Sequence, residues 1–233
     1  MLGKKWLALF AIGIGLALAV SACGGSDNKK DNGVVVSGAG GLPADITPIS
    51  TPQGVPTPAG PPASDSDIQA IADAFAKVKS FRSTLTAGPA NSQQTTTIEM
   101  SYPDKVHITI KTATGTQELI CANNLIYTKT DKWVKNEKDP TGKAVDCTSY
   151  ASSIFNTKTI GDGLKASAAN ISKGGTDTVN GKKCQILQQV NPNGSTADIC
   201  VADGLPIRIV DKGAGATIIF SDYNANIDIK API

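Results

Sequence analysis

Histidine is almost missing from this chain of 233 residues, in which His107 is the only one. A Ser-His-Asp triad could therefore use no other histidine, and the sequence contains no G-x-S-x-G elbow. Loops of the G-x-x-x-x-G-K-[ST], G-x-G-x-x-G and EF-hand types are also absent. Carboxylates are scattered, and nothing in their spacing points to the paired acids of glycoside hydrolysis. We therefore expect His107 to be a solvated strand residue and the protein not to be an enzyme.

Metal-ligand spacing is missing as well. No cysteine lies in a C-x-x-C pair, and one histidine is too few for the usual zinc sites, so we expect no metal and no cofactor. Aromatic residues make up only 5% of the chain. A curved sheet with so few large side chains either packs a solid core or encloses a cavity for an apolar ligand. The residues alone slightly favour the solid core.

Long apolar runs are absent except for one, which covers residues 6–20 and follows Lys4 and Lys5. About fifteen helical residues span roughly 22 Å, less than the ~30 Å core of a bilayer. The run ends in the small residues Val20-Ser21-Ala22 before Cys23, which predicts a secretory signal peptide over residues 1–22. This ending resembles the lipobox of bacterial lipoproteins, and the resemblance implies a diacylglyceryl group on Cys23. The alternative is an ordinary signal peptide with an incidental cysteine.

Removal of the signal peptide leaves a formally neutral chain. The 22 basic residues lose two lysines and become 20, which equals the 20 acidic residues. Nothing in this balance favours a nucleic-acid partner or a polybasic membrane patch. Residues 23–63 are rich in Pro, Gly and Ser and contain no aromatic residue, which predicts a disordered tether.

The folded domain is expected over residues 64–233. Ser64 or Ser66 can cap an amphipathic helix that ends near Ser80, after which the apolar period changes from 3.6 to two. About ten strands in antiparallel meanders follow, and two short helices interrupt them between Cys147 and Asn170. We expect an α+β fold with one apolar and one polar sheet face.

Four cysteines remain after Cys23, and an even number in an exported chain indicates two disulfides. The predicted hairpin of Lys182–Val190 and Thr196–Val201 places Cys184 directly opposite Cys200, at a distance that suits a disulfide. Cys121–Cys147 then follows by elimination.

A series of segments, each weak by itself, together resembles the LolA/LolB-like lipoprotein carriers and the related mycobacterial LppX/LprG lipoproteins. The resemblance covers essentially residues 66–233. The matching segments, in order, are Ser80-Phe81-Arg82, Tyr102-Pro103-Asp104-Lys105-Val106, Asn124-Leu125-Ile126-Tyr127 with Trp133, Asn180-Gly181-Lys182-Lys183-Cys184, residues 200–208, residues 220–229 and Ala231-Pro232.

The resemblance implies a half-barrel of about eleven antiparallel strands, with helices closing its concave face around a cavity for acyl chains. Strand alternation then predicts which side chains face that cavity, or else pack against the helices. These candidate ligand-binding residues are Ile98, Met100, Val106, Ile108, Ile110, Trp133, Ile207, Ile209, Ile218 and Phe220.

The expected function is that of an extracytoplasmic lipoprotein, anchored to the bacterial cell membrane, that binds or transfers lipid. Since the LolA carrier is soluble and this chain has a lipobox, the resemblance favours anchored receptors over a shuttle. An outer-membrane location is possible in a diderm cell, and we expect a monomer. The alternative is an envelope sensory or structural protein that uses the same fold as a protein-binding module without a ligand.

Overall fold

The computed structural model describes residues 60–89, 92–139, 141–191 and 194–233. The predicted signal peptide, Cys23 and most of the predicted tether lie outside these ranges. No helix in the described ranges is both long and apolar enough to cross a membrane.

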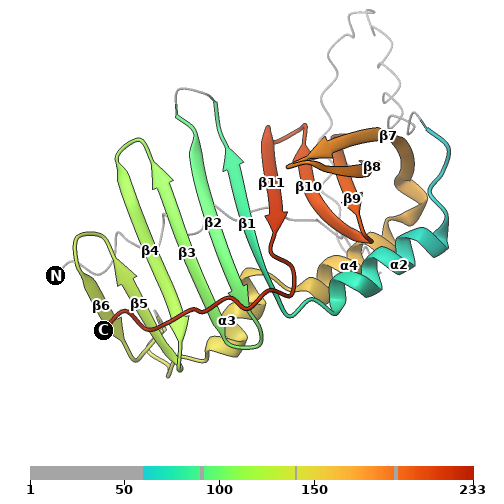
Figure 1. The fold of residues 1–233 in the computed structure, drawn as a ribbon. Helices are drawn as coiled ribbons and strands as arrows, with labels where there is room; N and C mark the ends of the chain where they lie inside the picture. Colours follow the sequence, from blue (N-terminus) through green and yellow to red (C-terminus); the bar gives the residue numbers. More distant parts are fainter. Residues whose placement is uncertain (1–59, 90–91, 140, 192–193) are drawn as a thin grey trace, which may run out of the picture. The chain divides into compact units, whose positions relative to one another are not determined.

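Eleven antiparallel strands form one open, curved sheet in the order β6-β5-β4-β3-β2-β1-β11-β10-β9-β8-β7 (Figure 1). The fold is therefore α+β, as the sequence predicted. The first six strands are β1 (Ser80–Ala87), β2 (Gln94–Ser101), β3 (Lys105–Thr112), β4 (Gly115–Ala122), β5 (Leu125–Lys129) and β6 (Trp133–Asn136). The others are β7 (Ile171–Val179), β8 (Lys182–Val190), β9 (Thr196–Ala202), β10 (Leu205–Asp211) and β11 (Ala216–Ser221).

Two meanders make up this sheet, β1–β6 and β7–β11, and they join where β1 pairs with β11. Strict alternation along β2 shows why the strands form: Thr96, Ile98 and Met100 are buried, and the residues between them are less so. We call the face that contains these three side chains the inner face and the opposite one the outer face.

Helix α2 (Asp65–Ala76) begins at Ser64, whose hydroxyl accepts a hydrogen bond from the backbone N–H of Asp67. Ile68, Ile71 and Phe75 form its buried stripe, as the periodicity predicted. The helix ends at Ala76, earlier than predicted, because the chain must become extended by Ser80 to begin β1.

The helical segment between β6 and β7 consists of α3 (Cys147–Ile154), α4 (Thr157–Ala166) and a short 3-10 turn (Ala168–Asn170). Asp146 caps α3 and Asn156 caps α4. α3 packs on β3 and β4, and α4 packs along α2 (Figure 1).

Both predicted disulfides are present, Cys121–Cys147 and Cys184–Cys200, with Cα–Cα distances of 5.6 and 5.5 Å. The first joins β4 to the start of α3. The predicted register of the second was wrong by two residues, because β8 and β9 pair Ile186 with Cys200. Backbone hydrogen bonds within the loop from Asn191 to Ser195 move the centre of the hairpin, so Cys184 meets Cys200 diagonally.

The outer face is covered at one end by the C-terminal segment, which crosses in front of the strands on the side opposite α3 (Figure 1). Ile227 and Ile229 are buried there against Ile120, Ala122 and Tyr127. At the other end of the chain, residues 60–63 run along β7: the Ala63 N–H donates to the Ile171 carbonyl at 3.0 Å.

Gly161 sets how closely α4 approaches α2, since a Cβ there would lie 2.9 Å from the Ala72 carbonyl oxygen. Gly161→Ala should therefore destabilise the protein by about 1–3 kcal/mol, although alanine is the better helix former. Urea denaturation measures the change. Thr159→Ala, at an exposed position of the same helix, is the matched control and should stay within about 0.5 kcal/mol of wild type. Equal stability of Gly161→Ala and wild type would contradict the close packing.

Candidate functional site

Inner-face side chains form three rows that run across the strands. The lower row, nearest α3, contains Phe81, Met100, Val106 and Cys121, and all four side chains are fully buried. The middle row, one step along the strands, contains Phe220, Ser83, Ile98, Ile108 and Leu119, which are 1–6% exposed.

The upper row differs because most of its side chains are only partly buried. The strand register aligns Ile209, Ile218, Leu85, Thr96, Ile110 and Gln117 across six neighbouring strands. Of these, only Thr96 is buried. Four strand spacings of ~4.8 Å separate Ile209 from Ile110, so the apolar row is about 19 Å long. It is a partly exposed apolar strip on a face that is otherwise packed.

A small hollow lies at one end of this upper row. Its volume is about 10 Å³, and its lining includes Ile108, Ile110, Gln117 and Leu119. That is space for about one water molecule. The side chains of the lower and middle rows are packed as a solid core at this place.

Eight of the ten predicted ligand-binding residues lie on the inner face. Ile110, Ile209 and Ile218 belong to the upper row, and Ile98, Met100, Val106, Ile108 and Phe220 belong to the buried rows.

The other two, Trp133 and Ile207, lie elsewhere. Trp133 pairs with Lys129, which pairs with Glu118, and this register places all three on the outer face. Ile207 sits at a β-bulge between Pro206 and Arg208 and packs against Cys184 and Cys200 instead of the inner-face cluster. Alternation misplaced Trp133 because its strand has only four residues, and Ile207 because a bulge shifts the alternation by one.

Sequence reasoning missed Leu85, which links the two halves of the upper row. Leu85 pairs with Ile218 on one side and Thr96 on the other. The only signal was its apolar character within a predicted strand. Its position opposite Ile218 depends on a pairing between residues far apart in sequence.

An aromatic cluster closes the space below the upper row at β1 and β11. Phe81 lies 4.8 Å from Phe155 and 6.0 Å from Phe220, and Phe75 of α2 lies 6.0 Å from Phe155, all between ring centroids. The last two of these pairs are edge-to-face, an arrangement that adds about 0.5–1.5 kcal/mol per pair beyond the area that the rings bury. Burial also raises the pKa of nearby Tyr102 to about 12, so its hydroxyl stays protonated and donates to the Phe155 carbonyl at 2.6 Å.

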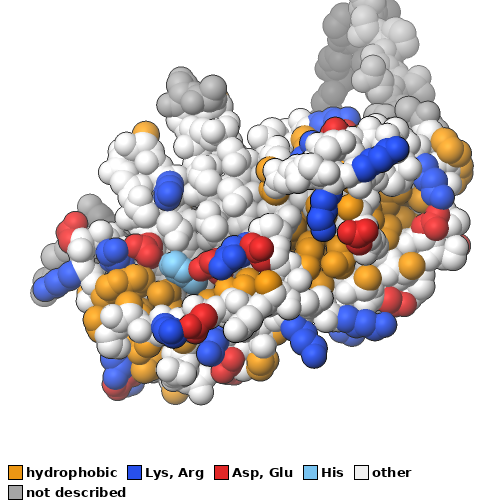
Figure 2. Space-filling model, in the orientation of Figure 1, with side chains coloured by type: hydrophobic (Ala, Val, Ile, Leu, Met, Phe, Trp, Pro, Cys, Tyr) orange, Lys and Arg blue, Asp and Glu red, His pale blue; other side chains and the backbone are white. Residues whose placement is uncertain are grey.

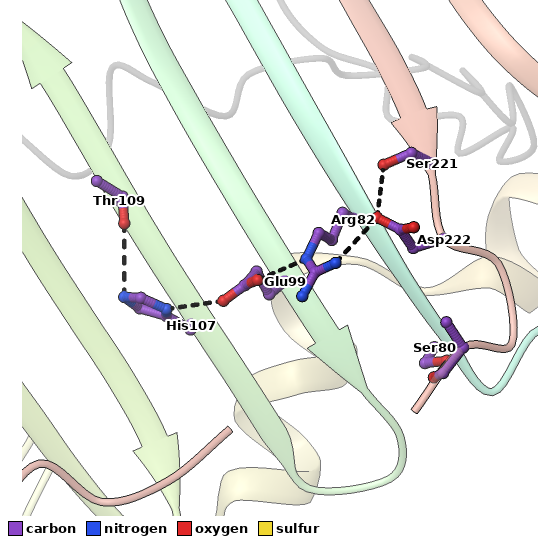
Figure 3. Close-up of polar contacts among 8 residues, drawn as sticks. Ser80, Arg82, Glu99, His107, Thr109, Ser221 and Asp222 are labelled. Carbon is purple, nitrogen blue, oxygen red and sulfur yellow. Dashed lines mark hydrogen bonds and ion pairs between the residues drawn. The ribbon is translucent and has the colours of Figure 1, made fainter. Parts of the chain in front are cut away.

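The outer face carries a different feature, a strip of charged side chains around the one histidine (Figure 2). Arg82 donates to Glu99 at 2.6 Å and to Asp222 at 3.0 Å, and Glu99 also faces Nδ1 of His107 at 3.0 Å (Figure 3). Nε2 of His107 lies 3.3 Å from Glu118. A neutral imidazole has a single N–H, so only the protonated ring donates to both carboxylates.

His107 belongs to this charged strip. Its ring contacts two carboxylates and the Thr109 hydroxyl on the outer face of the sheet. Burial tends to raise the pKa of Glu99, but hydrogen bonds from Arg82 and His107 outweigh it and lower that pKa. A hydrogen bond from Lys129 lowers the pKa of Glu118. Among the described residues, no group of His, Cys, Asp and Glu side chains is arranged to hold a metal ion.

No protein-family model matches this chain, and no curated protein matches its sequence. Solved structures do match. LprF from Mycobacterium bovis superposes with a TM-score of 0.51 at 16% identity, over 74% of this chain and 99% of LprF. The lipoprotein LppX from Mycobacterium tuberculosis superposes with a TM-score of 0.47 at 14% identity, over 71% of this chain and 97% of LppX. MucB in complex with MucA(peri) superposes with a TM-score of 0.39 at 13% identity, over 73% of this chain and 58% of the matched chain.

These observations define the class of fold. The protein is an open, curved antiparallel half-barrel with helices on its inner face. Within that class, the superposition shows that this chain shares the fold of LprF from Mycobacterium bovis.

The lowered pKa of Glu99 leads to a pH prediction. A carboxylate with a lowered folded-state pKa stabilises the protein above its unfolded pKa, near 4.5, and this contribution is lost as the pH falls through the folded value. Glu99→Gln should be less stable than wild type at pH 7 and should lose less stability between pH 5 and pH 3. Urea denaturation across this pH range measures both. Parallel curves for the two proteins would contradict the prediction.

Proposed function

We propose that this protein is a membrane-anchored extracytoplasmic lipoprotein whose domain binds a lipid through an acyl chain laid along the upper row. The observation that carries the proposal is the partly exposed apolar strip formed by Ile209, Ile218, Leu85 and Ile110. Its length of about 19 Å suits an extended acyl chain. The resemblance of the sequence to the LolA/LppX-like lipoprotein carriers implies the same class of ligand, and the fold shared with LprF is in keeping with that resemblance.

The energetics of such a site are adequate for reversible binding. Burial of a methylene contributes about 0.8 kcal/mol, so ten methylenes on this row would contribute roughly 8 kcal/mol. Association costs of about 4–15 kcal/mol oppose this gain, and contacts to the rest of the lipid would have to add to it. A site that both takes up and releases lipid needs this moderate balance.

The anchoring part of the proposal rests on Cys23 and on the two disulfides. Disulfides persist in oxidising compartments outside the cytoplasm. A diacylglyceryl group on Cys23 would hold the chain firmly, because two acyl chains bind a bilayer much more strongly than one. The tether would let the domain reach lipids near its own membrane. The proposal includes a monomeric protein, no nucleic-acid partner and no catalytic step.

A second candidate is an envelope protein-binding module with the same fold and no ligand. The observation that favours it is the solid packing of the lower and middle rows, where Met100 is 0% and Ile108 1% exposed. The two candidates differ in what the upper row contacts, so a lipid-binding experiment on that row separates them.

Ile218→Glu tests the upper row, since a carboxylate placed on the strip would oppose an acyl chain there. We expect at least a tenfold loss of affinity for a fluorescent fatty acid, with the fold retained because Ile218 is only partly buried. The matched control is Ile219→Glu, the next residue of β11, which points to the outer face and is also partly buried. Titration measures affinity, and circular dichroism checks the fold.

Met100→Glu serves as the contrasting variant. Because Met100 is fully buried, an unpaired carboxylate there should unfold the protein. Organic extraction of the purified wild-type chain should also release co-purified lipid. A wild-type protein that carries no lipid and takes up no fatty acid would exclude lipid binding and favour the second candidate.

Cys23→Ala tests the anchor. We expect the variant to lose incorporation of labelled palmitate and to move from the membrane fraction to the soluble or secreted fraction. Cys184→Ala and Cys200→Ala together form the control, because they remove two other cysteines without touching the lipobox. Label on the Cys23→Ala chain would show that another residue is acylated and would overturn the assignment.

A further inference from the structure

The joint between α3 and α4 brings a single aromatic side chain into the core. α3 is fixed to the sheet by Cys121–Cys147 and by a hydrogen bond from the Cys147 N–H to Asn124 at 3.2 Å. α4 is fixed instead to α2, through Gly161 and a 2.9 Å ion pair between Lys165 and Asp73. The two helices are thus held on different supports.

Phe155 lies between these two fixed helices. It follows the last residue of α3 and is extended, with φ −151° and ψ 111°, directly before the α4 cap Asn156. Its ring completes the cluster with Phe75, Phe81 and Phe220, which belong to α2, β1 and β11. Those three rings are 0–4% exposed, whereas Phe155 is only partly buried.

The position of the cluster relative to the upper row gives Phe155 its significance. Phe220 lies two residues from Ile218 along the same face of β11, a distance of about 7 Å at ~3.3 Å per residue. The cluster therefore bounds the upper row on the side toward the helices. Tyr102 and Tyr223 also lie in connections beside these rings, but the hydroxyl of each donates to a backbone carbonyl. Phe155 is the ring from a connection that has no polar group to hold it in place.

We propose that Phe155 limits how far an acyl chain reaches from the upper row into the space between α2, β1 and β11, and so sets the chain length accepted. This inference rests on the proposed function and adds a specificity-determining residue to it. Loss of the ring would leave an apolar space enclosed by Phe75, Phe81 and Phe220, next to the row.

The experiment compares saturated fatty acids of increasing length, as competitors of a fluorescent fatty acid, on the purified chain. Cys23→Ala is included in every protein so that no acyl group of its own competes. For wild type, affinity should rise about fourfold per added methylene and then level off when the chain reaches the ring. For Phe155→Ala, affinity should continue to rise for longer chains, reaching at least tenfold above wild type for the longest chains tested.

Two further variants keep the test decisive. Phe155→Leu, a smaller change that preserves an apolar side chain, should move the plateau in the same direction if Phe155→Ala does not fold. Tyr127→Ala, a large truncation buried on the outer face, is the control and should leave the length dependence unchanged. The same plateau in wild type and both folded Phe155 variants would overturn the inference while the proposed function stands. Absence of binding by wild type would instead overturn the proposed function.

Discussion

Pairing of β1 with β11 is the constraint on which the rest of the structure depends, because it alone joins the two meanders into one sheet. It places Ile218 beside Leu85 and Phe220 beside Ser83, which aligns side chains from both halves of the chain in common rows. It also brings Asp222 to Arg82, so the same pairing organises the charged strip on the outer face.

Burial changes along the strands, and this gradient separates stability from the proposed binding. At the end where α3 lies, Met100 and Val106 are fully buried and supply core energy. One row further along, Phe220 and Ile108 remain buried, and beyond them the isoleucines of the upper row are partly exposed. Because a helical cover reaches only part of the inner face, a substitution in the upper row should affect ligand binding more than folding.

Each meander also has a disulfide of its own. Cys121–Cys147 fixes α3 to the first, and Cys184–Cys200 joins neighbouring strands of the second. Sequence reasoning found both pairs, since an exported chain with four remaining cysteines allows few arrangements. It placed the second pair in the wrong register, because the true centre of a hairpin loop depends on hydrogen bonds within the loop.

The sequence by itself determined the α+β class, a capped helix that begins at Ser64 or Ser66, the helical interruption after β6 and the face of most strand residues, since all of these follow from local periodicity and capping. Alternation was sufficient for Ile98, Met100, Val106 and Ile108, and it was not sufficient where a four-residue strand or a bulge intervened, at Trp133 and Ile207. Only the tertiary structure decided that Leu85, Ile110, Ile209 and Ile218 form one row and that Phe155 joins the aromatic cluster with Phe81 and Phe220. The physical reason is that these contacts join residues far apart in the chain, and their alignment depends on strand register, which local sequence patterns do not specify.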